Sequence, residues 1–205
     1  MKLTNQYNRM IYKIWSPVYD AVLGGFFNKG RVRSIAVATL QPGEKVLLVG
    51  VGTGSDLPLL PQGVSAVGTD ISEPMLTRAK AKLPLPGRDI SLLQGDAMDM
   101  AFADGTFDVI LMNLILSVVP DPGKCMAEAL RVLRPNGRIV IFDKFLPDGA
   151  KPALRRRLAN LGSTLAGTDI NRRLGDILKG LPVRIVHDEP SILGGMYRVV
   201  LLKKI

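Results

Sequence analysis

An apolar run followed at once by closely spaced glycines decides the fold of this chain: KVLLV at residues 45–49, then GVGTG at residues 50–54. A short apolar run after a Pro42-Gly43 turn is typical of a buried strand. Glycines directly after a strand let a ligand approach the backbone, and a helix that begins there favours negative charge. The stretch therefore predicts a strand, a nucleotide-cofactor loop and a helix.

The alternation of strands and helices continues on the C-terminal side of this stretch. Strands are predicted at residues 65–69, 90–94, 107–112 and 138–142, with helices over residues 73–83 and 124–133. Such alternation is typical of βαβ units. Two closing strands, 183–187 and 197–202, are joined by a short loop and are expected to pair antiparallel. We predict an α/β, Rossmann-like, seven-stranded doubly wound sheet with an antiparallel last strand.

The chain length predicts one domain over residues 1–205, because 205 residues bury one core of ordinary size but not two. Three-and-four spacing of apolar residues predicts N-terminal helices and a helical insert after strand five, in which a short helix begins at Gly167. The expected parts are an N-terminal helical cap (1–40), a cofactor-binding core (41–145), the helical insert (146–182) and a C-terminal strand pair (183–205).

Composition narrows the chemistry. One cysteine, Cys125, excludes an intrachain disulfide framework and multi-cysteine zinc sites, and one histidine, His187, leaves little for a transition metal, so no metal site is expected. No apolar stretch reaches the roughly 18 residues that cross a bilayer, and the first residues show no signal peptide. We therefore expect a cytoplasmic protein. The formal charge of +9 indicates an anionic partner. The charge alone does not distinguish among nucleic acid, phospholipid and a phosphorylated substrate.

Asp70 strengthens the cofactor hypothesis. It lies 20 residues after Gly50 at the end of the second predicted strand, where a carboxylate can accept hydrogen bonds from both ribose hydroxyls. A simple turn and helix cap is the alternative. Dehydrogenases share the loop and the acid, but their third glycine position falls at residue 55, which is Ser55 here, and this chain has Gly54 instead.

The G-x-G-x-G pattern resembles class I S-adenosylmethionine (SAM) dependent methyltransferases. Four more segments follow in that family's order: DIS and ML within 70–76, GDA at 95–97, FDVI at 107–110 and LRPNGR at 133–138. The resemblance covers about residues 41–145. The segments at 15–20, 49–54 and 117–122 are similar to small bacterial phosphatidylethanolamine N-methyltransferases and, more loosely, to quinone C-methyltransferases.

The resemblance implies SAM as cofactor, S-adenosylhomocysteine as product, and a role for each matching residue. Three glycines would pass beneath the methionine part, and Asp70 would hold the ribose. Hydrophobic and acidic residues of the next two loops would surround the adenine, and two residues after strand four would border the sulfonium. The implied cofactor residues are Gly50, Gly52, Gly54, Asp70, Ile71, Met75, Asp96, Ala97, Asn113 and Leu114.

The chain departs from the family at two places. Leu48 stands where the family usually has an acid that helps to hold the ammonium of SAM, so cofactor affinity is expected to fall unless a neighbour such as Asp56 substitutes. A non-catalytic protein that uses the fold for another ligand is the alternative. Strand five runs into Asp143-Lys144-Phe145, where the phospholipid enzymes often have Asn-His-Phe.

Methyl transfer needs alignment more than a catalytic motif, since the cofactor supplies the driving force. An amine nucleophile must be neutral, and Tyr19, Asp143 or Asp20 could take its proton by position. We expect a SAM-dependent methyltransferase for a small or amphiphilic acceptor, with an amine or phospholipid headgroup first. A small-molecule O- or C-acceptor of the quinone kind is the second choice.

Positive charge collects in two segments, residues 1–34 and 151–175, each with six basic residues and one acidic residue. The first also holds Tyr12 and Trp15, a composition typical of an interfacial helix, so an anionic membrane surface is a candidate partner at the inner membrane face. A solvated face is the alternative. Nucleic acid is not expected, because Asn113-Leu114-Ile115-Leu116 lacks the Asp/Asn-Pro-Pro-Tyr clamp for a flipped base. The sequence does not indicate an oligomeric state.

Overall fold

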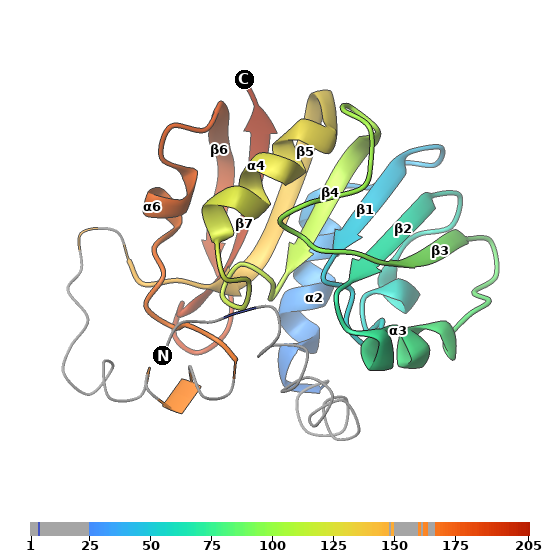
Figure 1. Cartoon of the computed structure of the whole chain (residues 1–205), viewed down its shortest axis with the longest axis horizontal. Coiled ribbons are helices and arrows are strands. Elements are labelled where there is room, and N and C mark those ends of the chain that lie inside the picture. Colours follow the sequence, from blue (N-terminus) through green and yellow to red (C-terminus); the bar gives the residue numbers. More distant parts are fainter. Residues whose placement is uncertain (1–3, 5–24, 148, 150–159, 161, 164–166) are drawn as a thin grey trace.

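A seven-stranded sheet forms the centre of the computed structural model, which describes residues 4, 25–147, 149, 160, 162–163 and 167–205 (Figure 1). The strand order is β3-β2-β1-β4-β5-β7-β6; β7 pairs antiparallel with both β5 and β6, and the other pairs are parallel. The predicted doubly wound sheet with an antiparallel last strand is confirmed. The strands are β1 Lys45–Val49, β2 Ser65–Asp70, β3 Asp89–Gln94, β4 Phe107–Asn113, β5 Leu133–Lys144, β6 Val183–Pro190 and β7 Tyr197–Lys204.

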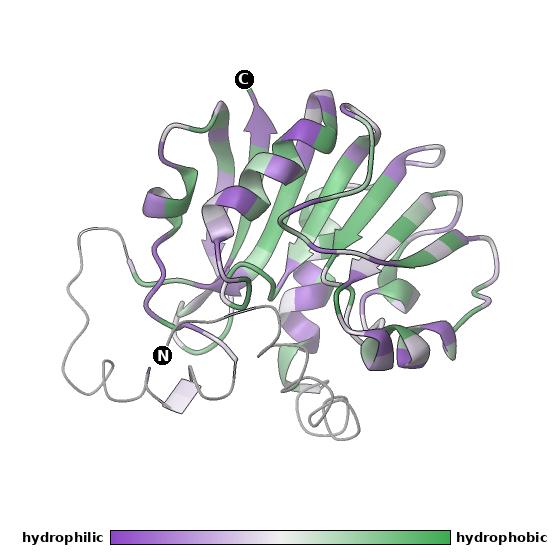
Figure 2. Cartoon of the chain, in the orientation of Figure 1, coloured by the Kyte–Doolittle hydropathy of each residue, from purple (hydrophilic) through white to green (hydrophobic). Residues whose placement is uncertain are grey.

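Helices cover both faces of the sheet. α2 (Gly25–Ala38) and α3 (Glu73–Lys80) pack on one face, and α4 (Pro122–Val132) and α6 (Leu174–Leu178) pack on the other. Side chains alternate along each strand, so Leu47 enters one core cluster and Leu48 the other. Burial on both faces explains the nearly continuous apolar sequence of β1 and β4. Figure 2 shows these central strands as hydrophobic, with hydrophilic residues on the surrounding helices and loops.

The parallel strands bring distant segments to one edge of the sheet. Val49 is paired with Thr69 at the end of β1, and Asp70 is paired with Gln94 at the end of β2. Asn113, the last residue of β4, is paired with Phe142 in β5. The loops that follow β1, β2, β3 and β4 therefore start side by side.

The prediction of an α-helix directly after the glycine loop is wrong. Only a short 3-10 helix, η2 (Leu57–Leu59), is present there. Pro58 is tolerated near its start, but Pro61 disfavours helical backbone at the residue before it, and Leu60 is extended with ψ 139°. The loop thus presents its own backbone to a ligand, without a long helix dipole behind it.

Other boundaries also shift. β5 begins at Leu133 rather than at residue 138, so the family-like LRPNG segment belongs to the strand, with an irregular pairing between Phe107 and Val109 of β4. The short helix expected from Gly167 begins only at Leu174. Most of the N-terminal cap and of the first insert helix lies outside the described residues, which include α2 of that cap.

Gly30 allows α2 to approach the sheet. A Cβ atom at this position would lie 2.1 Å from Cζ of Phe142 in β5. We expect Gly30→Ala to lower the free energy of unfolding by about 1–3 kcal/mol through overpacking, even though alanine favours a helix. Urea denaturation measures the change. Gly25→Ala in the same helix meets no atom within 4 Å and is the control. Equal unfolding free energies for both variants would contradict the close approach.

Candidate functional site

A cavity opens at the edge where β1, β2 and β4 end. It encloses about 810 Å³ outside the protein atoms, a volume that includes space open to solvent. Its lining includes nine of the ten cofactor residues named from the sequence, all except Gly54. The further lining residues are Arg31, Val51, Thr53, Thr69, Gly95, Ile115, Val118 and Val119.

The glycines of the loop have different tasks. Gly52 has φ +57°, and a Cβ there would meet nothing within 4 Å, so its backbone borders open space in the cavity lining. Gly50 has φ +69°, and its Cβ would lie 2.6 Å from Cδ1 of Ile115. Gly54 is outside the lining: its Cβ would lie 3.0 Å from Cβ of Ala79, so it lets α3 pack closely.

Asp70 ties the end of β2 to the glycine loop. Its Oδ2 accepts a hydrogen bond from the Gly52 backbone N–H at 2.9 Å, and its Oδ1 accepts one from Ser72 N–H at 2.8 Å. Burial raises the pKa of this carboxyl, and the backbone N–H groups oppose that rise. Each carboxylate oxygen can accept a further hydrogen bond, so the pair can receive two hydroxyls of a ligand.

Apolar groups and one acid form the end of the cavity beside β2 and β3. Met75 of α3 is buried, and Ile71 and Ala97 line the same part of the cavity. Asp96 follows β3, and its Oδ1 accepts from Met98 N–H at 2.9 Å. This arrangement suits a flat base with a donor at its edge.

The opposite wall is formed by the segment after β4. Leu114 has φ +62° and donates its N–H to the Phe142 carbonyl at 2.7 Å. Ile115, Val118 and Val119 add apolar surface to this wall. Asn113, at its start, is 5% exposed and is the polar residue of the wall.

Arg31 is a lining residue that the sequence reasoning missed. It comes from α2, and its Nη1 lies 2.8 Å from Asp56 Oδ2, with both side chains less than a tenth exposed. Asp56 is outside the cavity lining and contacts the lining residue Arg31. Leu48 is buried in the core. No local pattern could find this pair, because its members are 25 residues apart and belong to different elements.

The structure does not bring Asp143 to the cavity. This fully buried carboxylate accepts from Ser117 N–H at 2.9 Å and from its neighbour Lys144 N–H at 2.8 Å. It supports the wall after β4 from beneath. The other candidate bases, Tyr19 and Asp20, lie outside the described residues.

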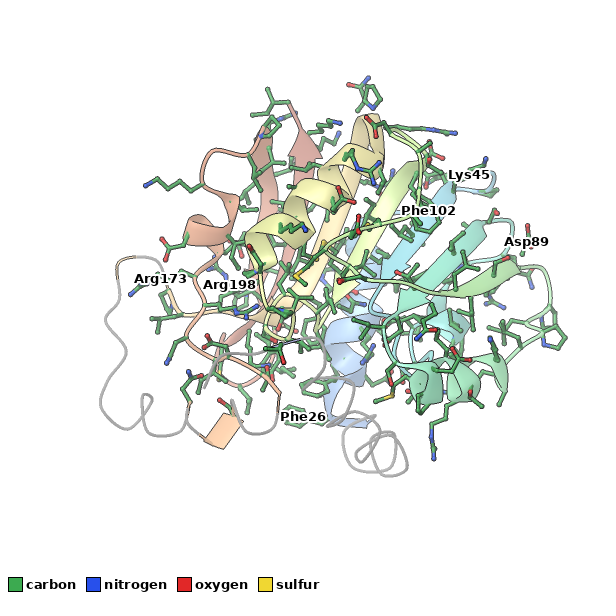
Figure 3. The ribbon with its side chains drawn as sticks, in the orientation of Figure 1. Phe26, Lys45, Asp89, Phe102, Arg173 and Arg198 are labelled. Atoms are coloured by element: carbon green, nitrogen blue, oxygen red, sulfur yellow. The ribbon has the colours of Figure 1, made fainter. Side chains whose placement is uncertain are left out.

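The described members of the two basic segments are largely paired with carboxylates. Arg33 binds Glu189 through Nη2 and Oε2 at 2.9 Å, which holds the pKa of Glu189 at about 2. Arg173 lies 3.4 Å from Asp176. Figure 3 places Arg173 and Arg198 on the α6–β7 side of the molecule, opposite Asp89 on the β3 edge.

The membrane-surface hypothesis depends mainly on residues outside the described part and stays a prediction. In that part, no helix has the length and apolar character to span a bilayer.

Comparison with known proteins identifies the family of this chain. The methyltransferase domain family matches residues 47–141. The chain is 34% identical over 189 residues to a phosphatidylethanolamine N-methyltransferase of Cereibacter sphaeroides, covering 91% of this chain and 92% of that one. It is 40% identical over 134 residues to a demethylmenaquinone methyltransferase of Renibacterium salmoninarum, covering 62% of this chain and 54% of the relative.

A solved structure, the methyltransferase bound to the Haloferax volcanii Trm112 activator, has the same fold. The TM-score is 0.79 at 16% identity, over 96% of each chain. The 34% identity to the phosphatidylethanolamine N-methyltransferase, over nearly the whole of both chains, shows that the chain belongs to the class I SAM-dependent methyltransferases. It is an enzyme that uses S-adenosylmethionine as its cofactor.

Asp70 offers a direct test of the site. We expect Asp70→Ala to weaken binding of S-adenosylhomocysteine by about 1–3 kcal/mol, because charge-assisted hydrogen bonds are lost. Isothermal titration calorimetry measures the affinity, and circular dichroism checks the fold. Asp89→Ala, on the exposed edge strand, is the matched control and should bind as the parent does. Unchanged affinity in Asp70→Ala would remove this acid from the site.

Proposed function

We propose that the cofactor lies along the carboxyl edge of the sheet and presents its methyl group at the end of β4. The observation that carries this proposal is the order of the lining groups. The apolar slot and Asp96 follow β2 and β3, Asp70 ends β2, the glycine loop follows β1, and Asn113 ends β4. The groups after β3, β2 and β1 match adenine, ribose and the methionine part in their order along the cofactor. The reactive methyl branches from the sulfur between the ribose and the amino-acid end, and in this proposal it faces the end of β4.

The residues present fit such a cofactor. The Gly52 backbone borders open space that a side chain would otherwise fill, and Asp70 keeps acceptor capacity after binding two backbone N–H groups. When bound, the cofactor supplies an activated methyl group for an in-line displacement. The chain's own part is to bind the ends of the cofactor, to orient the nucleophile and to keep water away from the apolar wall.

Arg31 is suited to the carboxylate of the methionine part. Its guanidinium lies in the lining next to the glycine loop, and the salt bridge to Asp56 fixes its orientation. A buried guanidinium with a planar set of donors can bind a second carboxylate. The acid that the family usually has in place of Leu48 holds the ammonium of the methionine part. In this proposal Arg31 holds the carboxylate of the same part, and this contact offsets the one that is lost at the ammonium.

For the acceptor, we propose a small or amphiphilic molecule with an amine, such as a phospholipid headgroup. Support comes from the relative named for phosphatidylethanolamine methylation, which matches nearly the whole of both chains. The relative named for demethylmenaquinone methylation matches over 54% of its length, and a quinone-like carbon acceptor is the second candidate.

An acceptor assay separates the two candidates. With radiolabelled SAM, we expect transfer to phosphatidylethanolamine in mixed micelles to be at least about tenfold faster than transfer to a demethylmenaquinol. This rate ratio corresponds to a difference of about 1.4 kcal/mol in activation free energy. Asp70→Ala is the low-binding control. Faster transfer to the quinol would replace the first candidate by the second.

The Arg31 assignment is tested with two ligands. The double variant Arg31→Gln/Asp56→Asn removes both charges and so avoids an unpaired buried acid. We expect its affinity for S-adenosylhomocysteine to fall by about tenfold or more, because a charge-assisted hydrogen bond is lost. Affinity for 5′-methylthioadenosine, which lacks the amino-acid end, should change by less than about twofold by the same reasoning. A parallel loss for both ligands in calorimetry would contradict the assignment.

A further inference from the structure

Lys144, the last residue of β5, is a buried lysine. It is 7% exposed, although lysine side chains are mostly exposed in folded proteins. Its Nζ donates a hydrogen bond to Ser117 Oγ at 2.9 Å and lies 5.6 Å from the centroid of the Tyr197 ring, within the range of a cation–π contact. Because burial of an amine costs free energy, its contact with Ser117 calls for an explanation.

Ser117 belongs to the wall after β4 and faces away from the cavity. Val118 and Val119 line the cavity, whereas Ser117 is fully buried and outside the lining. Its N–H donates to Asp143 Oδ2 at 2.9 Å, and its carbonyl accepts from Asp169 N–H at 2.8 Å. The side chain and both backbone groups of Ser117 are thus bound, so a shift of this residue would move the two lining valines that follow it.

The charges around Lys144 come from the same residues. Burial lowers the pKa of Lys144, and Asp143 opposes this shift. Arg172 lowers this pKa further, whereas Asp169 raises it. The two carboxylates that stabilise the ammonium form therefore belong to the residues that bind the Ser117 backbone, one in β5 and one in the insert. Lys144 lies where both of these segments meet the wall.

The two ends of the wall are held in different ways. At its start, Leu114 N–H is bound to a β5 carbonyl at 2.7 Å, and Ile115 lies against the glycine loop. A Cβ on Gly50 would lie 2.6 Å from Ile115 Cδ1. The far end begins at Ser117 and is held by the contacts described above, including the one with Lys144. Loss of that contact should therefore disturb the far end and leave the glycine loop in place.

We propose that Lys144 is a positioning residue for the methyl acceptor. Its hydrogen bond to Ser117 keeps the far end of the wall, with Val118 and Val119, in the place where it contacts the acceptor. This inference rests on the proposed function, which puts the transferred methyl at the end of β4 and so brings the acceptor against this wall. Lys144 itself is outside the cavity lining and acts through the wall.

A kinetic test separates the acceptor from the cofactor. Lys144→Met keeps a long side chain and removes the donor, and Asp143 retains its two backbone N–H groups. We expect KM for phosphatidylethanolamine to rise by about tenfold or more and kcat to change by less than about threefold, because a hydrogen bond that positions the acceptor wall is lost. The Kd of S-adenosylhomocysteine in calorimetry should stay within about twofold. Equal losses of acceptor and cofactor would overturn the proposal, as would an unchanged KM.

Lys204→Met is the matched control. Lys144 is paired with the first residue of β7, and Lys204 is the last residue of the same strand. Its Nζ donates to the Leu130 carbonyl at 2.8 Å, so this variant removes a lysine hydrogen bond at the other end of the sheet. Its KM for phosphatidylethanolamine should equal that of the parent. A similar rise in KM for Lys204→Met would mean that general destabilisation explains the effect of Lys144→Met.

A double variant tests whether Lys144 acts through Ser117. Ser117→Ala removes the acceptor of the same hydrogen bond, and its KM should rise at least as much as that of Lys144→Met. Adding Lys144→Met to Ser117→Ala should change KM by less than about twofold, because residues in one contact are not additive. Multiplication of the two single effects would overturn the proposal.

Amide hydrogen exchange followed by NMR tests the wall without an acceptor. In Lys144→Met, we expect the N–H groups of Ser117 and Asp169 to exchange at least about tenfold faster, while that of Leu114 stays within about twofold of the parent. Unchanged exchange at Ser117 would overturn the role of Lys144. Failure of the parent to methylate either acceptor named above, while it binds S-adenosylhomocysteine, would instead overturn the proposed acceptor. The exchange rates distinguish these two results.

Discussion

Both faces of the central strands are buried, and this constraint determines where chemistry can occur. Helices α2 and α3 cover one face and α4 and α6 the other, so the strands between them are apolar along most of their length. Polar side chains that must meet a ligand are therefore placed where the parallel strands end. Asp70 and Asn113 are the last residues of β2 and β4, and the glycine loop follows β1. The cavity is a consequence of strand order and register.

The polar side chains of the cavity differ in how many hydrogen-bond or ion-pair partners they have within the protein. Asp70 receives two backbone N–H groups, one from the glycine loop, so this carboxylate and the loop are positioned together. Arg31 forms a salt bridge with Asp56, and both side chains are less than a tenth exposed. Asn113 has no partner among the described residues. The polar side chains thus have fewer partners within the protein the nearer they lie to the place proposed for the acceptor.

The wall after β4 depends on support from behind. Ser117 is fully buried and makes three hydrogen bonds to two other segments. It donates its N–H to Asp143 and accepts from Lys144 Nζ, both in β5, and its carbonyl accepts from Asp169 N–H at 2.8 Å. Burial lowers the pKa of Lys144, and the nearby Asp143 opposes this shift. The residues at the end of β5 thus support the wall after β4 and do not line the cavity, to which the sequence analysis assigned Asp143 as a candidate base.

The sequence by itself determined the strand pattern, the sheet, the glycine loop and most of the cavity lining, because these follow from local periodicity and from motifs placed at strand ends. Only the tertiary structure decided what Arg31, Gly54 and Asp143 contact. Arg31 meets Asp56 from a separate helix, Gly54 packs against α3, and Asp143 turns to backbone N–H groups inside the protein. Such pairings depend on how elements pack across the sheet, and sequence spacing carries no record of that geometry.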